Sequence, residues 1–176
     1  MMNEAIQVRD AAHFIRYGCV FCKTGREEAV VESLEAQNPG LSASYVSQIK
    51  RKTVQGITST VQQITMPGYV YFQTNSFDPP YLKYVEDAIR LVRPSAGSWA
   101  LMGMDAWFAK WVFENHGVIR FSKARLVDNR VQIMGGPLKD LEDCIVRIVK
   151  RERCAQVLLP FLDREVRIWL AFEYQE

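Results

Sequence analysis

The eight residues MPGYVYFQ, 66–73, combine a chain break with a strand. The Pro-Gly pair interrupts regular structure, and the five residues after it are rich in the aromatic and β-branched types that strands favour. Because side chains alternate along a strand, Tyr69 and Tyr71 share one face, and Val70 and Phe72 share the other. One of these faces must be core, so the stretch predicts a strand within a sheet.

The sequence before this stretch predicts a strand, a helix and a hairpin. Residues 17–23 form an apolar run typical of a strand, and Thr24 is a candidate N-cap for a helix that ends at 38–40. Residues 44–53 and 56–65 alternate and are separated by a turn. We expect a long hairpin whose tip carries Lys50, Arg51 and Lys52.

The sequence after it predicts two more helices. Residues 78–92 place apolar side chains at helical spacing, residues 99–104 indicate a short strand, and Asp105 is a candidate cap for a helix over 106–114. The resulting order is β-α-β-β-β-α-β-α. Helices are then expected to cover one face of a mostly antiparallel sheet, an α+β arrangement.

The last third of the chain changes in character. Residues 118–127 are mixed and polar and predict a linker, after which four short strands are expected at 130–134, 144–149, 155–159 and 165–170. Short strands at even spacing indicate a small β-barrel. The predicted organisation is a lead-in over 1–16, an N-terminal domain over 17–117, the linker, and a C-terminal domain over 128–176.

Composition excludes several functional classes. The chain has 22 basic and 20 acidic residues, a net charge of +2, so any nucleic-acid signal must be local. No apolar run is long enough to span a bilayer, and the N-terminal residues lack a signal-peptide pattern, so we expect a cytoplasmic protein. Cys19 and Cys22 form a C-x-x-C, but a strand points them to opposite faces, which favours core thiols over a metal site. No phosphate-binding loop or histidine cluster is present, so neither an enzyme nor a cofactor is predicted.

Four segments together resemble the NusG family of transcription elongation factors. They are 17–34, the MPGYV of 66–70, the capped helix near Asp105, and GPLKDLE at 136–142 followed by IVRI and KRER at 145–148 and 150–153. The last resembles a KOW motif in the form found in specialised antitermination paralogues of the LoaP, UpxY and RfaH types. The match covers nearly all of the chain after residue 16. It departs from the family at Asp143, where a glycine is usual and where we expect a positive φ.

The resemblance implies that the N-terminal domain binds the clamp helices of RNA polymerase, near the non-template DNA strand. The family's positions around the binding depression correspond to Tyr17, Met66, Pro67, Tyr69 and Tyr71. The tyrosine face of 69–73 is then partner-facing, with a plain core role as the alternative. The same resemblance makes Lys50, Arg51 and Lys52 candidates for DNA phosphates, whereas such a run by itself is as easily a solvated turn.

The resemblance also implies partners for the C-terminal domain. Loop cations there suit a nascent RNA hairpin, unless they form a solvated, ion-paired surface; they are Lys139, Lys150, Arg151, Arg153 and Arg164. Phe161 corresponds to a loop aromatic that engages a ribosomal protein or a termination factor. The aromatic cluster of Trp107, Phe108 and Trp111 is expected to pack on the sheet, with contact to polymerase or to the C-terminal domain as the alternative.

The predicted function is therefore that of a monomeric transcription elongation and antitermination factor. The alternative is a ribosome-associated KOW protein that binds structured RNA without contacting polymerase.

Overall fold

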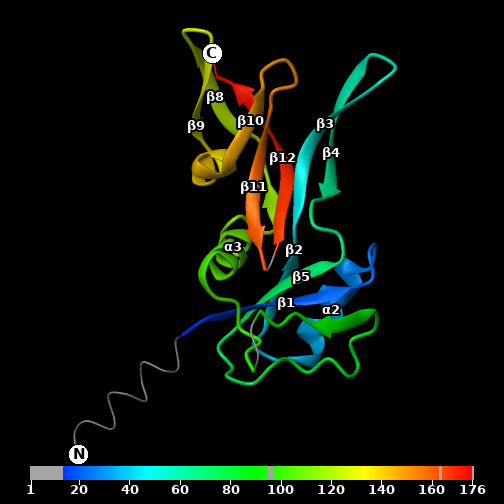
Figure 1. The fold of residues 1–176 in the computed structure, drawn as a ribbon. Coiled ribbons are helices and arrows are strands. Elements are labelled where there is room, and N and C mark those ends of the chain that lie inside the picture. The colour runs from blue at the N-terminus through cyan, green and yellow to red at the C-terminus, as the bar shows by residue number, and fades with distance from the viewer. Residues whose placement is uncertain (1–13, 95–96, 163, 176) are drawn as a thin grey trace, which may run out of the picture. The chain divides into compact units, whose positions relative to one another are not determined.

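A computed structural model describes residues 14–94, 97–162 and 164–175 (Figure 1). The chain divides into two compact units. Unit 1 comprises Met1–Tyr45 and Met66–His116, and unit 2 comprises Val46–Thr65 and Gly117–Glu176. The hairpin that the sequence predicts within the N-terminal domain therefore belongs, by its contacts, to the same unit as the C-terminal strands.

Unit 1 is built on a four-stranded antiparallel sheet. Its strands are β1 (Arg16–Cys22), β2 (Ser42–Tyr45), β5 (Tyr69–Thr74) and β6 (Ala88–Leu91), in the order β2-β5-β1-β6. The described residues of unit 1 also form the helices α2 (Glu27–Gln37) and α3 (Gly103–Glu114). The strands predicted over 17–23 and 69–73 are present, and the mixed α+β class is confirmed.

One face of this sheet packs against α2. The helix contributes Val30 and Leu34 to a buried cluster that includes Val70 and Phe72 of β5. Gly18 lies opposite Phe72 in register, and a Cβ at Gly18 would come within 2.2 Å of the Phe72 ring. The close approach of this ring to the β1 backbone therefore requires glycine at position 18.

Both helix starts differ from the prediction. Helix α2 has Arg26 as its N-cap residue, so Thr24 is not the cap. The helix ends at Gln37, just before 38–40, as expected. Helix α3 begins at Gly103 after Met102, which places Asp105 within the first turn, where a carboxylate still interacts favourably with the helix dipole. The strand predicted over 99–104 does not form, because this helix starts within it.

The predicted helix over 78–92 is wrong. The segment consists of turns followed by β6, which pairs with β1. Asp87 has a φ of 65°, a left-handed value that no α-helix contains, and its carboxylate is held by Lys23 and Arg26 at 2.8 and 2.6 Å. The segment therefore forms no helix despite the helical spacing of its apolar residues, because its last residues pair with the edge of β1 and Asp87 is held by its two ion pairs.

The hairpin of unit 2 forms as the sequence predicts. It consists of β3 (Ser47–Val54) and β4 (Ile57–Ile64), and β3 also pairs in parallel with the short β7 (Val118–Ile119). Gln55 and Gly56 have φ values of 51° and 80°, as the two central residues of a type I′ turn require.

A second sheet of unit 2 has the order β10-β11-β12-β8-β9 and resembles half a barrel. Its elements in chain order are β8 (Ser122–Val127), β9 (Arg130–Gly135), α4 (Pro137–Asp140), the 3₁₀ helix η1 (Glu142–Cys144), β10 (Ile145–Val149), β11 (Cys154–Phe161) and β12 (Arg164–Tyr174). The four predicted strands correspond to β9 to β12. The segment predicted as a linker holds β7 and β8, and β8 pairs with β12 in parallel and with β9 antiparallel.

The KOW-like segment is anchored through Gly136. This residue has φ 84° and ψ −171°, a backbone region nearly restricted to glycine, and a Cβ there would lie 3.0 Å from the Ser122 Cα. The buried Ser122 hydroxyl accepts the N–H of Leu138 at 2.8 Å. Asp143 lies in η1, and its φ is not positive, so the conformation expected for it is wrong. In this segment the position that requires glycine is Gly136.

Candidate functional site

Tyr69 and Tyr71 share a face of β5 but have different surroundings. Tyr71 is fully buried, and its hydroxyl donates to the Met66 sulfur at 3.7 Å. Its ring meets Phe108 of α3 edge-on, with centroids 5.8 Å apart, and burial raises the pKa of its hydroxyl well above the ordinary value. Contrary to the prediction, Tyr71 offers no surface to a partner, and Met66, which is also buried, offers almost none. Their side chains fill the space beneath this face.

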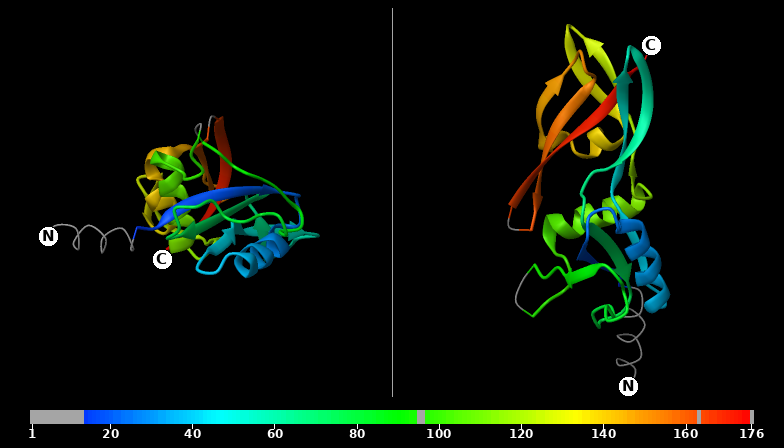
Figure 2. Two further views of the ribbon diagram at one scale, coloured as in Figure 1. Left: turned by 90° about the horizontal axis from the view of Figure 1, so that it is seen from below. Right: turned by 90° about the vertical axis from the view of Figure 1, so that its right-hand side faces the viewer.

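Helix α3 covers part of the tyrosine face. Phe108 and Trp111 are buried, and the Phe113 ring lies 6.2 Å from that of Tyr17. Trp107 stacks on Trp111 at 6.4 Å and keeps 38% of its surface exposed. Packing on the sheet, the interpretation that the sequence favours, therefore holds for Phe108 and Trp111. Because α2 covers the other face, the two helices lie on opposite sides of the sheet (Figure 2). The expectation that the helices cover one face of the sheet is therefore wrong.

Beyond α3, the tyrosine face ends in a partly exposed aromatic group. Phe21 and Tyr69 are opposite each other in register, with ring centroids 5.3 Å apart. The guanidinium of Arg90 lies 5.6 Å from the Phe21 ring, and Pro67 is exposed. We call Phe21, Pro67, Tyr69 and Arg90 the aromatic end of the sheet. It keeps two of the five residues predicted for polymerase binding, Pro67 and Tyr69, and adds two that the prediction missed.

The loop at the aromatic end is fixed by Glu27. This side chain is only 1% exposed, and its two carboxylate oxygens accept the backbone N–H groups of Gly68 at 2.7 Å and Gly25 at 2.8 Å. Gly68 has a φ of 83°, and its Cβ position would lie 3.1 Å from the Phe21 ring. A carboxylate hydrogen-bonded to two backbone groups of separate loops holds the Pro67–Gly68 turn against β1.

The two cysteines of the C-x-x-C are both buried and free, as the sequence predicts. Burial raises the pKa of Cys22 to about 11 and that of Cys19 further still, so both thiols stay protonated at neutral pH. Among the residues that the structure describes, no group of three or more His, Cys, Asp or Glu side chains is placed to hold a metal ion. Within the same residues, no helix is both long and apolar enough to cross a membrane.

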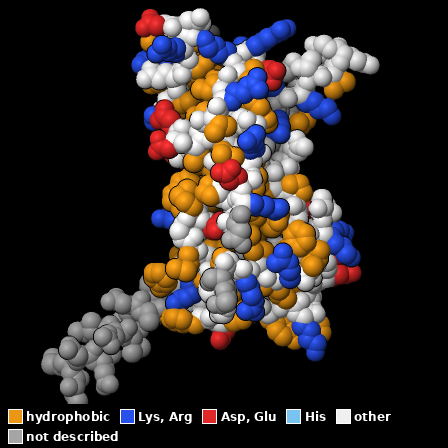
Figure 3. Space-filling model, viewed as in Figure 1, with side chains coloured by type: hydrophobic (Ala, Val, Ile, Leu, Met, Phe, Trp, Pro, Cys, Tyr) orange, Lys and Arg blue, Asp and Glu red, His pale blue; other side chains and the backbone are white. Residues whose placement is uncertain are grey.

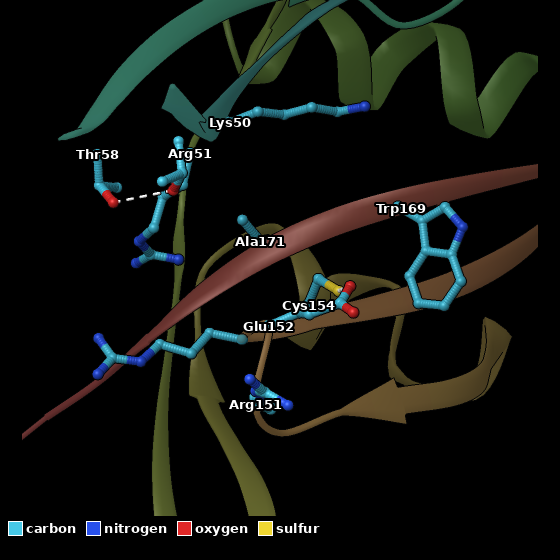
Figure 4. Close-up of a pocket in the computed structure, with 10 residues that line it drawn as sticks. Lys50, Arg51, Thr58, Arg151, Glu152, Cys154, Trp169 and Ala171 are labelled. Carbon is cyan, nitrogen blue, oxygen red and sulfur yellow. Dashed lines mark hydrogen bonds between the residues drawn. The ribbon is translucent and has the colours of Figure 1, made fainter. Parts of the chain in front are cut away.

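Unit 2 contains a basic cleft of about 730 Å³ (Figure 4). It is lined by Lys50, Arg51, Thr53, Thr58, Arg151, Glu152, Arg153, Cys154, Trp169 and Ala171. The cleft brings residues predicted separately for DNA and for RNA into one place. Basic side chains also lie over the strands of this unit on the face shown in Figure 3.

Lys50, Arg51 and Lys52 lie along β3 and not at the hairpin tip, since Arg51 is opposite Thr60 in register. Because side chains alternate along a strand, Arg51 points to the opposite face of β3 from Lys50 and Lys52. Arg51 donates to the Phe172 carbonyl at 3.2 Å and to Glu173 at 3.0 Å. Its guanidinium also lies 4.4 Å from the Phe121 ring, so Arg51 attaches the hairpin to the second sheet.

The remaining predicted RNA-binding residues do not lie together. Lys139 pairs with Glu142, and Lys150 donates to the Asn129 carbonyl. Arg164 is at the opposite end of β11 from the turn that holds Arg151 and Arg153, because Phe161 pairs with Arg164 and Cys154 pairs with Ala171. The eight residues of β11 separate these ends by about 23 Å, so the five predicted cations do not bracket one end of the sheet.

Phe161 is not an exposed loop residue. It ends β11, is 3% exposed, and has the Arg164 guanidinium 5.7 Å from its ring. The predicted loop anchor for a protein partner is therefore part of the core of unit 2.

The sequence contains a signal for Trp169 that the prediction missed. Along β12, Ile168, Leu170 and Phe172 are buried, and Trp169 occupies the alternate face. A tryptophan on the polar face of an alternating strand indicates a binding surface. By contrast, no local pattern connects Phe21 with Arg90, since only the pairing of β1 with β6 brings them together.

Comparison with known proteins identifies a similar fold. No protein-family model matches the chain, and no curated protein matches it. A solved structure does, described as a study of domain interaction in Thermotoga maritima NusG. The chain resembles Thermotoga maritima NusG in fold. The TM-score is 0.50 at 19% identity, over 91% of this chain and 95% of that one.

Proposed function

We propose that this chain is a transcription elongation factor with antitermination activity. Unit 1 binds the clamp helices of bacterial RNA polymerase, and unit 2 binds a nascent RNA or a protein partner. The observation that carries the proposal is the fold shared with Thermotoga maritima NusG over 91% of the chain. The MPGYV segment, which resembles the NusG family in sequence, forms the turn and strand at the aromatic end.

The aromatic end is the surface of unit 1 that best suits a helical partner. Phe21, Tyr69 and Pro67 form an apolar area against which the side of a helix can pack. Arg90 at its margin can pair with an acidic residue of that helix. Because Tyr71 and Met66 fill the space beneath, and Glu27 fixes the turn, the surface is preorganised and little entropy is lost on binding.

The test is capture of purified RNA polymerase by the full chain. Phe21→Ala with Tyr69→Ala removes the aromatic pair. Interface aromatics commonly cost more than about 1 kcal/mol each on truncation, so affinity should fall roughly 30-fold or more. Tyr81→Ala with Tyr84→Ala is the matched control, because these two tyrosines are exposed elsewhere in unit 1 and have rings 5.8 Å apart. We expect the control pair to bind like the wild type.

Equal binding by the folded Phe21/Tyr69 double variant would show that the aromatic end is not the polymerase surface. Failure of the wild-type chain to capture polymerase, together with capture of ribosomes, would instead support the alternative of a ribosome-associated RNA-binding protein.

A further inference from the structure

The basic cleft contains an aromatic side chain that core packing does not explain. Trp169 is partly exposed on the outward side of β12, between Arg167 and Ala171 on the same face. A large apolar side chain on this side of a strand forgoes the free energy of full burial. The flat face of an indole provides a surface on which nucleic-acid bases stack without regard to their identity.

Besides Arg51, three cations line the cleft with this indole, and they come from two separate segments. Lys50 comes from β3, and Arg151 comes from the β10–β11 turn (Figure 4). Arg153 comes from the same turn. None of the ion pairs found among the described residues involves these three side chains. The guanidinium of Arg153 lies 5.6 Å from the Tyr174 ring, a contact with the face of the ring that leaves its N–H groups able to donate. All three side chains can therefore contact phosphates, in contrast to Arg51, which Glu173 and the Phe172 carbonyl hold in place.

Among the described residues that line the cleft, Glu152 is the one acidic residue. Its carboxylate accepts a weak hydrogen bond from the Cys154 thiol at 3.8 Å, and burial and this carboxylate raise the pKa of that thiol. A carboxylate repels phosphates but accepts hydrogen bonds from amino groups of bases, such as N4 of cytosine. Its place among cations therefore suits a ligand that presents both phosphates and base edges.

We propose that this cleft binds a single-stranded polynucleotide. One base stacks on Trp169, phosphates contact Lys50, Arg151 and Arg153, and a base amino group donates to Glu152. The cleft volume of about 730 Å³ falls in the range of roughly 300–1,000 Å³ typical of ligand sites. A duplex does not suit it, because paired bases stack on each other and leave no face for the indole. The source of the strand, a transcript or the non-template DNA, rests on the proposed function. The binding site itself does not depend on it.

Tryptophan fluorescence of the full chain tests the site directly. Trp169 is the only tryptophan of unit 2, and the other three are Trp99, Trp107 and Trp111 of unit 1. Titration with short oligo(C) should quench the Trp169 signal, and Trp169→Phe should remove this quenching. Oligo(rC) and oligo(dC) identify the source, since tighter binding of one assigns the site to a transcript or to DNA. A duplex of matched length should bind more weakly than either.

Substitutions separate the three contacts. Loss of one stacked base should weaken oligo(C) binding by roughly 5- to 150-fold in both Trp169→Ala and the more conservative Trp169→Leu. Arg151→Ala with Arg153→Ala should reduce the slope of log affinity against log salt by about 1.4. Lys123→Ala with Arg130→Ala, two exposed cations of unit 2 outside the cleft, is the control of equal charge. Glu152→Gln should reduce the preference for oligo(C) over oligo(U).

The proposal is overturned if the wild-type chain binds no single strand, if the duplex binds as tightly, or if folded Trp169→Leu binds like the wild type. A salt slope that falls equally in the Lys123/Arg130 control would also overturn it, because the charge effect would then be general. Capture of polymerase by the full chain is measured separately, so either result can fail while the other stands.

Discussion

Glu27 provides the sharpest test of how the chain holds its aromatic end. Glu27→Ala removes a buried carboxylate that accepts two backbone N–H groups, at 2.7 Å from Gly68 and 2.8 Å from Gly25. Hydrogen bonds to a charged group contribute about 1.5–3 kcal/mol each, and the Gly25 N–H, being partly exposed, can regain water. We therefore expect a loss of about 2–4 kcal/mol in the free energy of unfolding of unit 1. The matched control is Glu28→Ala, because Glu28 is the adjacent glutamate and is exposed.

The assay is thermal unfolding followed by tryptophan fluorescence in a Trp169→Phe background. In that background all remaining tryptophans belong to unit 1, so the signal reports this unit alone. For a unit of this size, each kcal/mol corresponds to about 4–8 °C in Tm, which gives an expected decrease of roughly 8–30 °C. Polymerase capture should weaken at temperatures where the variant is still folded, since the Pro67–Gly68 turn is no longer held. If the two alanine variants agree within about 0.5 kcal/mol, the Glu27 hydrogen bonds do not stabilise the fold as reasoned.

Two further predictions concern stability. Gly136→Ala should destabilise unit 2 by about 1–3 kcal/mol, because its backbone region excludes a Cβ and Ser122 lies against it. Trp169 fluorescence measures this, and Gly135→Ala, where a Cβ meets nothing within 4 Å, should cost clearly less; similar costs would contradict the reasoning. The second concerns Asp87, whose two cationic partners lower the pKa of its carboxylate below 3.8. A lowered folded-state pKa contributes stability that is present at neutral pH and lost as the pH falls below 3.8 and through the folded value. Wild type should therefore exceed Asp87→Asn in Tm at pH 7, with the difference vanishing in acid; a constant difference across this range would count against the ion pairs.

Local patterns in the sequence were sufficient to predict the structure of a segment wherever that structure depends on the segment's own residues. The apolar runs that became β1 and β5, the helix that ends before Asn38-Pro39-Gly40, and the hairpin closed by Gln55-Gly56 were predicted this way. Backbone preferences and alternation act over a few residues, and these can be read directly. The α+β class followed from the order of such segments, and the resemblance to the NusG family followed from motifs such as MPGYV at 66–70 and GPLKDLE at 136–142.

Only the tertiary structure decided what each segment packs against. The apolar spacing of 78–92 is that of a helix, but the open edge of β1 takes up its last residues as β6. The face of β5 that carries the tyrosines is neither wholly buried nor wholly exposed, because α3 covers Tyr71 and leaves Tyr69 at the edge.

The basic cleft shows the same division between sequence and structure. Lys50, Arg151 and Arg153 could be named from the sequence as cations suited to phosphates. Their place in one cleft with Trp169 depends on the attachment of the β3–β4 hairpin to the second sheet through Arg51. Contacts between residues more than a hundred positions apart leave no local signal in a single sequence. Each residue could contact many others, and only the folded chain shows which contact forms.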